Sequence, residues 1–268
     1  MNILEQIMAT KKEEVASRMK TTPVAMLEQQ PGFARTTVSL CASIKQPGTT
    51  GIIAEYKRQS PSKGIINPHA KVQEVVSAYT RFGASGISVL TDELYFGGST
   101  AHLQAARAIT PLPLIRKDFI WHEYQITEAR AMGADVILLI AACLSPQQVQ
   151  QLATFAHSLQ LEVLLELHDP AELEHVCPEA DLIGINNRNL KTFEVNLQQS
   201  IQLANQLPAG RPRIAESGIH SAETLLYLKQ QGFDGFLMGE YFMKQANPAL
   251  AFEQFVQAIS QTTTNTEH

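Results

Sequence analysis

The sequence predicts an α/β protein, a (β/α)8 TIM barrel with an N-terminal helical extension. Short apolar strand candidates alternate with helical patterns along most of the chain, an order typical of a parallel sheet covered by helices. Three helix-to-strand junctions have the same form, in which Gly83, Gly133 or Gly232 ends a helix and a strand follows directly. The length of 268 residues suits one barrel of this kind, which takes roughly 250 residues.

The first part of the chain has a different pattern. Residues 2–20 predict an amphipathic helix, with apolar side chains near one side at Ile3, Leu4, Ile7, Met8 and Val15. Prolines at positions 23, 31 and 47 divide the following residues into short pieces, and no strand pattern appears before residue 51. We expect residues 1–48 to pack on the barrel as an extension, because so short a segment buries little core alone.

Eight strand candidates follow, and most are apolar on both faces, as in a parallel sheet that is covered by helices. They are Gly51–Lys57, Gly86–Leu90, Pro113–Lys117, Val136–Ala141, Glu162–Leu167, Leu182–Asn186, Arg213–Glu216 and Gly235–Met238. The helical patterns between them include Lys71–Phe82, Glu123–Met132, Pro146–Leu159 and Ala222–Gln231.

Eight such units favour a closed barrel over an open doubly wound sheet, and no G-x-G-x-x-G opens a helix after the first strand. We therefore expect one domain over residues 1–268. The barrel would occupy residues 49–260, and the polar residues 261–268 would form a disordered tail.

Composition excludes several classes of protein. The hydrophobic fraction of 44% and the charged fraction of 18% are ordinary for a globular protein, and the net charge of −5 argues against a general nucleic-acid surface. No signal-peptide pattern is visible, and no apolar run approaches the length of a membrane span, so we expect a cytoplasmic protein without a membrane partner. Cys41, Cys143 and Cys177 are too dispersed to suggest disulfides or a structural zinc site.

Polar residues gather where the predicted strands end, which is where barrels of this kind carry their chemistry. The strand bodies are apolar, so scattered surface charge does not explain this placement. The polar or small residues at these ends are Glu55, Lys57, Ser60, Lys117, Glu166, His168, Asn186, Arg188, Glu216, Ser217, Gly218, Gly239 and Glu240.

Strand alternation places several of these charges in the barrel mouth. Glu55 and Lys57 share one face of the first strand, and Lys117 and Glu166 can both point inward. We expect neighbouring ammonium groups to lower the pKa of each lysine and burial to raise the pKa of each glutamate, which would produce an acid and a base near neutral pH. A set of ion pairs that only satisfy each other is the structural alternative, and the full constellation favours function.

The last two strand ends suggest phosphate as part of the ligand. Ser217-Gly218 and Gly239-Glu240 would offer backbone N–H groups after the seventh and eighth strands, and Ser60 would add a hydroxyl. The Glu240 side chain would have to turn away from the anion. Ordinary turn glycines explain either pair alone, whereas both pairs together with Ser60 favour phosphate binding.

Long ordered motifs carry a family resemblance over almost the whole chain. They are Glu55-x-Lys57-x-x-Ser60-Pro61-Ser62-Lys63-Gly64, Ser88-Val89-Leu90-Thr91-Asp92, Tyr95-Phe96-x-Gly98-Ser99, Arg116-Lys117-Asp118-Phe119, Gly184-Ile185-Asn186-Asn187-Arg188-Asn189-Leu190 and Ala215-Glu216-Ser217-Gly218-Ile219. With these motifs the chain resembles indole-3-glycerol-phosphate synthase. The resemblance implies ring closure, decarboxylation and dehydration of 1-(2-carboxyphenylamino)-1-deoxyribulose 5-phosphate in tryptophan biosynthesis, by a carboxy-lyase.

The resemblance also implies a role for each catalytic residue. Lys117 would be the general acid for ring closure, and Glu166 the general base for dehydration. Lys57 would hold the anthranilate carboxylate and share in proton transfer. Glu55 would orient these groups, and Asn186 would hydrogen-bond the intermediate.

Other residues would bind the substrate. Glu216 would lie beside the intermediate, with Arg188 as a support for Glu55 or Asn186. Phe96, Phe119 and Leu138 would form an apolar slot for the anthranilate ring, with plain core packing as the alternative for Leu138. The phosphate residues would be Ser60, Ser217, Gly218, Gly239 and Glu240.

The chemistry implied requires no cofactor and no metal, and the sequence has no H-x-H, HExxH or P-loop motif. His168 would have a structural role. The expected partner is a small-molecule substrate, with no nucleic acid and no membrane. The chain would be a monomer or weak homodimer that can contact other tryptophan-pathway enzymes.

Two departures from the family pattern remove no catalytic group. Leu94 stands where some relatives carry a lysine, and Tyr56 is larger than expected but should face the helices. Two alternatives remain: another phosphate-binding barrel such as phosphoribosylanthranilate isomerase, which would use a Cys/Asp pair, or a non-catalytic barrel subunit.

Overall fold

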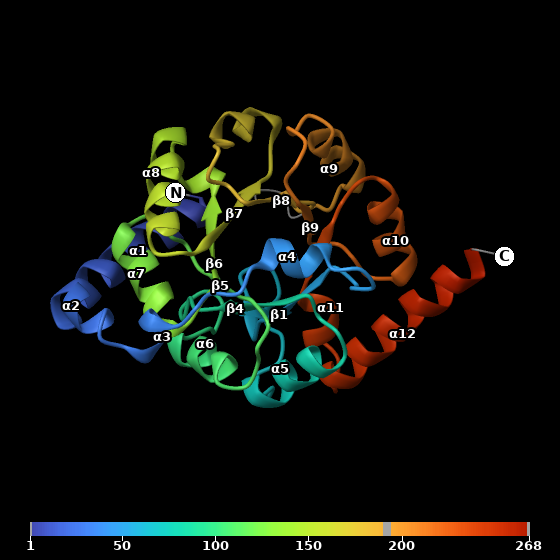
Figure 1. Cartoon of the computed structure of the whole chain (residues 1–268), viewed down its shortest axis with the longest axis horizontal. Helices are drawn as coiled ribbons and strands as arrows, with labels where there is room; N and C mark the ends of the chain where they lie inside the picture. Colours follow the sequence, from blue (N-terminus) through green and yellow to red (C-terminus); the bar gives the residue numbers. More distant parts are fainter. Residues whose placement is uncertain (1, 190–193, 267–268) are drawn as a thin grey trace.

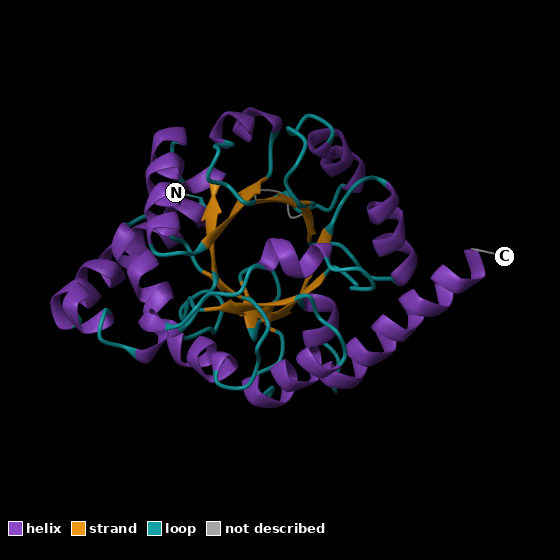
Figure 2. Ribbon diagram, in the orientation of Figure 1, coloured by secondary structure: helices purple, strands orange, loops and turns teal. Residues whose placement is uncertain are grey.

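A computed structural model describes residues 2–189 and 194–266, and within these ranges eight parallel strands close into a barrel with the helices outside (Figures 1 and 2). Neighbouring strands follow one another around the barrel in the order β1-β10-β9-β8-β7-β6-β5-β4. The strands are β1 (Ile52–Tyr56), β4 (Gly86–Leu90), β5 (Leu114–Lys117), β6 (Val136–Ile140), β7 (Glu162–Leu167), β8 (Leu182–Asn186), β9 (Arg213–Glu216) and β10 (Gly235–Met238). The predicted (β/α)8 barrel is confirmed.

The outer elements alternate with the strands. They are α5 (Val72–Arg81), α6 (Thr100–Arg107), α7 (Glu123–Met132), the 3-10 helix η1 (Ala141–Cys143), α8 (Pro146–Ser158), the 3-10 helix η2 (Pro170–His175), α9 (Leu197–Ala204), α10 (Ala222–Gln230), α11 (Glu240–Met243) and α12 (Pro248–Thr266). A short antiparallel hairpin, β2 (Gln59–Ser60) and β3 (Gly64–Ile65), follows β1. The predicted junctions at Gly83, Gly133 and Gly232 are confirmed, and each glycine is left-handed, with φ of 89°, 89° and 88°.

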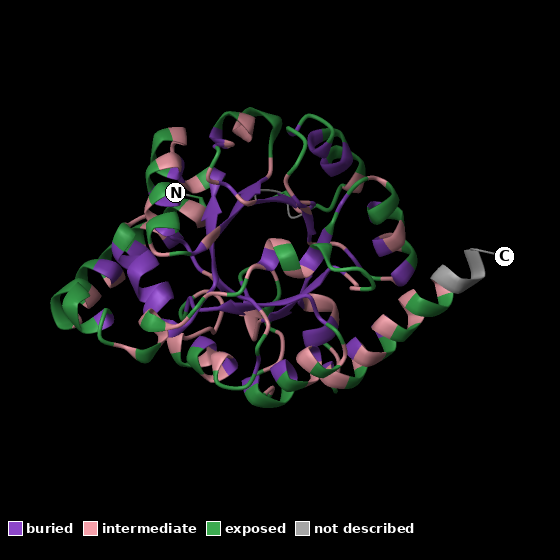
Figure 3. Ribbon diagram, in the orientation of Figure 1, coloured by how far each residue is buried: buried purple, intermediate pink, exposed green. Residues whose placement is uncertain are grey.

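Strand alternation divides the core into two parts. Ile53, Ile115 and Leu164 belong to an apolar cluster inside the barrel, whereas Ile52 and Tyr56 pack between the barrel and the helices. The strands are accordingly buried along their lengths, and exposure is confined mainly to the outer helices and loops (Figure 3). The Tyr56 hydroxyl donates to the Ala70 carbonyl at 2.7 Å, so this residue faces the helices as expected.

The N-terminal residues form α1 (Ile3–Thr21), α2 (Val24–Leu27), α3 (Pro31–Ala34) and α4 (Leu40–Lys45). Figure 1 shows α4 across an opening of the barrel, and its Leu40 and Ile44 join the interior cluster. Glu162, at the start of β7, accepts hydrogen bonds from the backbone N–H groups of Leu40 and Cys41. The extension therefore closes the end of the barrel where the strands begin.

The C-terminal end differs from the expectation of a disordered tail. Helix α12 runs to Thr266, so residues 261–266 continue a helix, while residues 267–268 lie outside the described residues. No helix within residues 2–189 and 194–266 is long and apolar enough to cross a membrane.

Candidate active site

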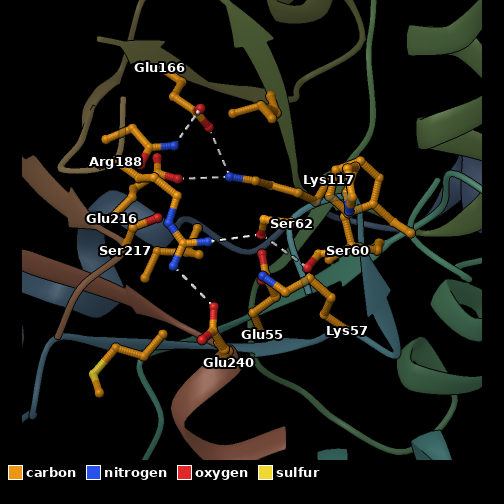
Figure 4. Close-up of a pocket in the computed structure, with 18 of the residues that line it drawn as sticks. Glu55, Lys57, Ser60, Ser62, Lys117, Glu166, Arg188, Glu216, Ser217 and Glu240 are labelled. Carbon is orange, nitrogen blue, oxygen red and sulfur yellow. Dashed lines mark hydrogen bonds and ion pairs between the residues drawn. The ribbon is translucent and has the colours of Figure 1, made fainter. Parts of the chain in front are cut away.

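A single cavity at the carboxyl ends of the strands brings the predicted site residues together. Its empty volume is about 1270 Å³, including space open to solvent. Every residue that the sequence assigned to the site lines this cavity, and Figure 4 shows many of them. They are Glu55, Lys57, Ser60, Phe96, Lys117, Phe119, Leu138, Glu166, Asn186, Arg188, Glu216, Ser217, Gly218, Gly239 and Glu240.

Lys117 lies between two carboxylates that come from other strands. Its Nζ is 2.9 Å from Oε2 of Glu166 on β7 and 2.7 Å from Oε2 of Glu216 on β9 (Figure 4). The Asn186 amide donates to the other Glu166 oxygen at 3.1 Å. These contacts join four strand ends, β5, β7, β8 and β9, around one ammonium group.

A second pair lies at the end of β1. The Lys57 ammonium is 2.7 Å from Oε1 of Glu55, whose side chain is buried. Gly239 leaves room for this carboxylate, because a Cβ at position 239 would lie 2.7 Å from the same Glu55 oxygen. Glu55 and Lys57 therefore lie on one face at the end of β1, as strand alternation predicts, and they form an ion pair there.

The pKa of Lys117 differs from the sequence prediction. Burial disfavours the Lys117 ammonium, but Glu166, Glu216 and Glu55 together hold the pKa of Lys117 above its ordinary value. We expected the pKa of this lysine to be lowered by neighbouring ammonium groups. That expectation was wrong, because the charges that act on Lys117 are carboxylates.

The two glutamates beside Lys117 differ from each other. Burial favours protonation of Glu166, but Lys117 and His168 hold the pKa of Glu166 well below its ordinary value, so the expected rise was wrong for this residue. Burial and the neighbouring Glu166 charge instead raise the pKa of Glu216 to about 8. Near neutral pH, this difference favours Glu166 as the carboxylate and Glu216 as the group that holds a proton.

Backbone groups line another part of the cavity. Ser217 and Gly218 are both left-handed, with φ of 67° and 73°, which turns the chain sharply after β9. Gly239 caps the short helix α11, which starts directly after β10. The backbones of Ser217-Gly218 and Gly239-Glu240 therefore line the same cavity as the buried Ser60.

Arg188 makes contacts that the sequence did not predict. Its guanidinium donates to Glu240 at 3.1 Å and to the Ser62 hydroxyl at 3.2 Å (Figure 4). Of its two expected partners, Glu55 and Asn186, Arg188 contacts Asn186, which accepts a hydrogen bond from the Arg188 backbone N–H at 3.1 Å. The Glu240 carboxylate points toward the Arg188 guanidinium, which partly neutralises its charge. A bound phosphate would require this, because the Glu240 side chain would otherwise repel the anion.

The apolar part of the cavity includes residues that sequence reasoning missed. Phe96 and Phe119 lie with ring centroids 5.9 Å apart, near Leu138. Ile3, Leu4 and Ile7 of α1 also line the cavity, as do Ser62, His220 and Tyr241. The amphipathic pattern of the first helix was visible in the sequence, but its apolar side did not indicate which part of the barrel it covers. Leu94 is 60% exposed and is not among the lining residues.

Within residues 2–189 and 194–266, no group of three or more His, Cys, Asp or Glu side chains has the arrangement of a metal site. The site geometry instead joins acid–base side chains, an apolar wall and a backbone-lined end in one cavity.

Comparisons with known proteins show the family of the chain. The family model for indole-3-glycerol phosphate synthase matches residues 4–255. The chain belongs to the indole-3-glycerol phosphate synthase family. It is 43% identical to the indole-3-glycerol phosphate synthase of Bacteroides thetaiotaomicron, with 96% of this chain and 99% of that protein covered. It is also 43% identical to that of Burkholderia vietnamiensis, with 93% and 97% covered.

Two solved structures at low sequence identity are similar to this chain in fold. A mutant tryptophan synthase α-subunit from Pyrococcus furiosus superposes with a TM-score of 0.59 at 9% identity, covering 80% of this chain and 98% of that chain. Thiamine phosphate pyrophosphorylase from the same organism has a TM-score of 0.58 at 16% identity, with 78% and 95% covered. At such identities the likeness is one of fold alone.

Proposed function

We propose that this protein is an indole-3-glycerol phosphate synthase, a carboxy-lyase of tryptophan biosynthesis. It converts 1-(2-carboxyphenylamino)-1-deoxyribulose 5-phosphate to indole-3-glycerol phosphate, carbon dioxide and water. The observation that carries the proposal is Lys117, held between Glu166 and Glu216 in a cavity with an apolar wall and a backbone-lined end. Family membership supports the same reaction.

The substrate spans the two ends of the cavity in this proposal. Its phosphate binds the backbone N–H groups of Ser217, Gly218, Gly239 and Glu240 and the Ser60 hydroxyl. The anthranilate ring packs against Phe96, Phe119 and Leu138, and Lys57 binds its carboxylate.

Ring closure needs a proton donor at the ketone. The aromatic carbon that bears the carboxylate attacks the ribulose carbonyl carbon, and Lys117 donates a proton to the carbonyl oxygen, which becomes a hydroxyl group. Carbon dioxide then leaves from the attacking carbon, and its bonding electrons restore the aromatic ring. The high pKa of Lys117 keeps it protonated in the free enzyme.

Dehydration needs a base and a second proton. Glu166 removes a proton from the former sugar carbon next to nitrogen, and the hydroxyl group leaves as water with a proton from a lysine of the site, to which Lys57 contributes. Asn186 binds the intermediate, Glu55 orients Lys57, and Glu216 lies beside the intermediate. The carboxylate form of Glu166 suits a base.

We further propose that the enzyme acts in the cytoplasm as a monomer or weak homodimer, with a small-molecule substrate and contacts to other tryptophan-pathway enzymes.

The decisive test is turnover of the carboxyphenylamino-deoxyribulose phosphate, followed by indole fluorescence. We expect turnover by the wild type and a loss of at least about 10²-fold in the double variant Lys117→Ala, Glu166→Gln, because each acid or base contributes roughly 10²–10⁴-fold. Lys71→Ala, at an exposed position on the outside of the barrel, is the matched control and should keep the wild-type rate. No turnover by the wild type, or full turnover by the double variant, would overturn the proposal. The first result would favour a non-catalytic subunit.

A further inference from the structure

A histidine lies behind Glu166, on the side away from Lys117. His168 follows the end of β7, and its side chain is only 8% exposed. Its Nε2 is 3.0 Å from Oε1 of Glu166, and its Nδ1 is 3.7 Å from Oε2 of Glu172. The imidazole therefore bridges a carboxylate of the site and a second carboxylate outside the cavity.

Local structure holds the second carboxylate in place. Glu172 belongs to η2, where its side chain and that of Asp169 form a capping box. The backbone N–H of His168 donates to Oε2 of Glu172 at 2.6 Å. Because the Glu172 carboxylate accepts hydrogen bonds from the backbone N–H groups of both His168 and Asp169, it is held where it can orient the imidazole ring.

The contacts divide the two Glu166 oxygens between different partners. Oε2 contacts the Lys117 ammonium at 2.9 Å, while Oε1 receives the Asn186 amide at 3.1 Å and lies beside His168. Without the imidazole, Oε1 of the buried Glu166 would contact only a neutral donor, the Asn186 amide.

The charges around His168 favour its protonated form. Burial disfavours the imidazolium, but Glu166 from β7 and Glu172 from η2 outweigh burial and raise the pKa of His168 to about 9. Beyond them, Glu166 faces Lys117 from β5 and Glu216 from β9, and the Cys143 thiol from η1 lies within electrostatic range of Glu166 and Glu172.

We propose that His168, oriented by Glu172, is a positioning residue that holds the Glu166 carboxylate in place opposite Lys117. This inference rests on the proposed function, in which Glu166 is the base. The imidazolium acts through Glu166 and does not touch the substrate.

Two variants separate charge from hydrogen bonding. His168→Gln keeps a donor that can reach Glu166 but carries no charge, whereas His168→Leu loses both. We expect kcat to fall about tenfold in the Gln variant and up to about 10²-fold in the Leu variant, since a misplacement of 1 Å can cost that much. KM should change less than kcat, because the phosphate and ring contacts remain. His157→Gln removes an imidazole that pairs with Asp181 at 2.9 Å on an outer helix, and it should keep the wild-type kcat.

A pH profile distinguishes positioning from a purely structural role. The wild-type kcat should decline as pH rises through about 9, where His168 loses its proton. His168→Gln should lack this decline, and Glu172→Gln should move it to lower pH, because loss of a carboxylate lowers the pKa of the imidazole. Glu216 titrates in the wild type, in His168→Gln and in Glu172→Gln alike. Differences between their pH profiles therefore come from the titration of His168.

Nuclear magnetic resonance of the imidazole in the ligand-free wild type tests the pair without turnover. We expect a midpoint near 9 and a lower midpoint in Glu172→Gln. An imidazole that titrates near 6.5, or a His168→Leu variant with wild-type kcat and pH profile, would overturn the inference. Failure of the wild type to turn over the substrate would instead refute the proposed function, while leaving the titration result intact.

Discussion

At the scale of single residues, one ammonium group makes two neighbouring glutamates different. Lys117 contacts both Glu166 and Glu216, yet burial and the Glu166 charge raise the pKa of Glu216 to about 8 while the pKa of Glu166 is lowered. His168 accounts for part of the difference, because it adds a second positive group next to Glu166 only. Two buried carboxylates that share one ammonium partner cannot both be ionised cheaply, which favours a proton on one of them.

The raised pKa of Glu216 predicts how stability depends on pH. The folded protein binds this proton more tightly than the unfolded chain, so the contribution is complete below pH 4.5 and is lost as pH rises through about 8. Urea unfolding at intervals from pH 5 to pH 8 should show falling stability in the wild type and a smaller fall in Glu216→Gln.

The pKa of His168 is raised too. Its contribution to the free energy of unfolding is therefore lost between pH 6.5 and about 9, in the wild type and in Glu216→Gln alike. Glu166 stays ionised over this range. Parallel stability curves for the wild type and Glu216→Gln would contradict the charge state that we assign to Glu216.

At the scale of elements, α1 covers the apolar part of the cavity and is held there by a buried charge. Lys11 is 1% exposed, and its Nζ lies 2.8 Å from Asp92 after β4 and 3.2 Å from Asp118 after β5. Further along the helix, Arg18 pairs with Glu128 of α7 at 2.8 Å. Asp118 directly follows Lys117, so the anchor of the covering helix is joined to the strand end that carries the proposed acid.

Removal of this anchor should affect both stability and substrate binding. Lys11→Met leaves Asp92 and Asp118 buried without their ammonium partner, and breaking a buried pair costs about 3–5 kcal/mol. We expect urea unfolding to show a loss of that order and steady-state kinetics to show a raised KM, because Ile3, Leu4 and Ile7 lose their fixed position.

Lys20→Met is the matched control, since Lys20 lies on the same helix and is exposed. It should leave the free energy of unfolding within about 0.5 kcal/mol of the wild type. An unchanged KM in a folded Lys11→Met protein would show that α1 does not contribute to substrate binding.

At the scale of the whole molecule, the extension covers both ends of the barrel. α1 contributes to the cavity at the carboxyl ends of the strands, and α4 closes the opposite end with Leu40 and Ile44. Leu40 is fully buried, and a Cβ at position 86 would lie 2.6 Å from its Cδ1. The end with the polar side chains is suited to chemistry, and the end with α4 is suited to stability.

This division predicts a variant that loses stability but not activity. Leu40→Ala should lower the free energy of unfolding by about 2–5 kcal/mol, through lost burial and a cavity at the barrel floor. Thermal unfolding should show a lower Tm, while kcat at 25 °C stays at the wild-type value. Met26→Ala, at a position that is 54% exposed, should change neither quantity. A kcat that falls together with Tm would show that the end of the barrel covered by α4 is coupled to the candidate active site.

The sequence by itself determined the barrel fold and most of the residues that line the cavity at the carboxyl ends of the strands. Strand alternation and polar strand ends depend on local order along the chain, and parallel strands bring their carboxyl ends together whatever the details of packing. For this reason Glu55, Lys117, Glu166 and Asn186 could be assigned to one cavity before any distance was known.

Only the tertiary structure decided which charges meet and which helix covers them. The contacts of Arg188 with Glu240 and Ser62, the place of Ile7 over the cavity and the bridge from Glu166 to Glu172 all join residues from different elements. The signs of the pKa shifts followed from these contacts, because electrostatic interaction between buried groups depends on separations of a few Å that sequence spacing does not specify.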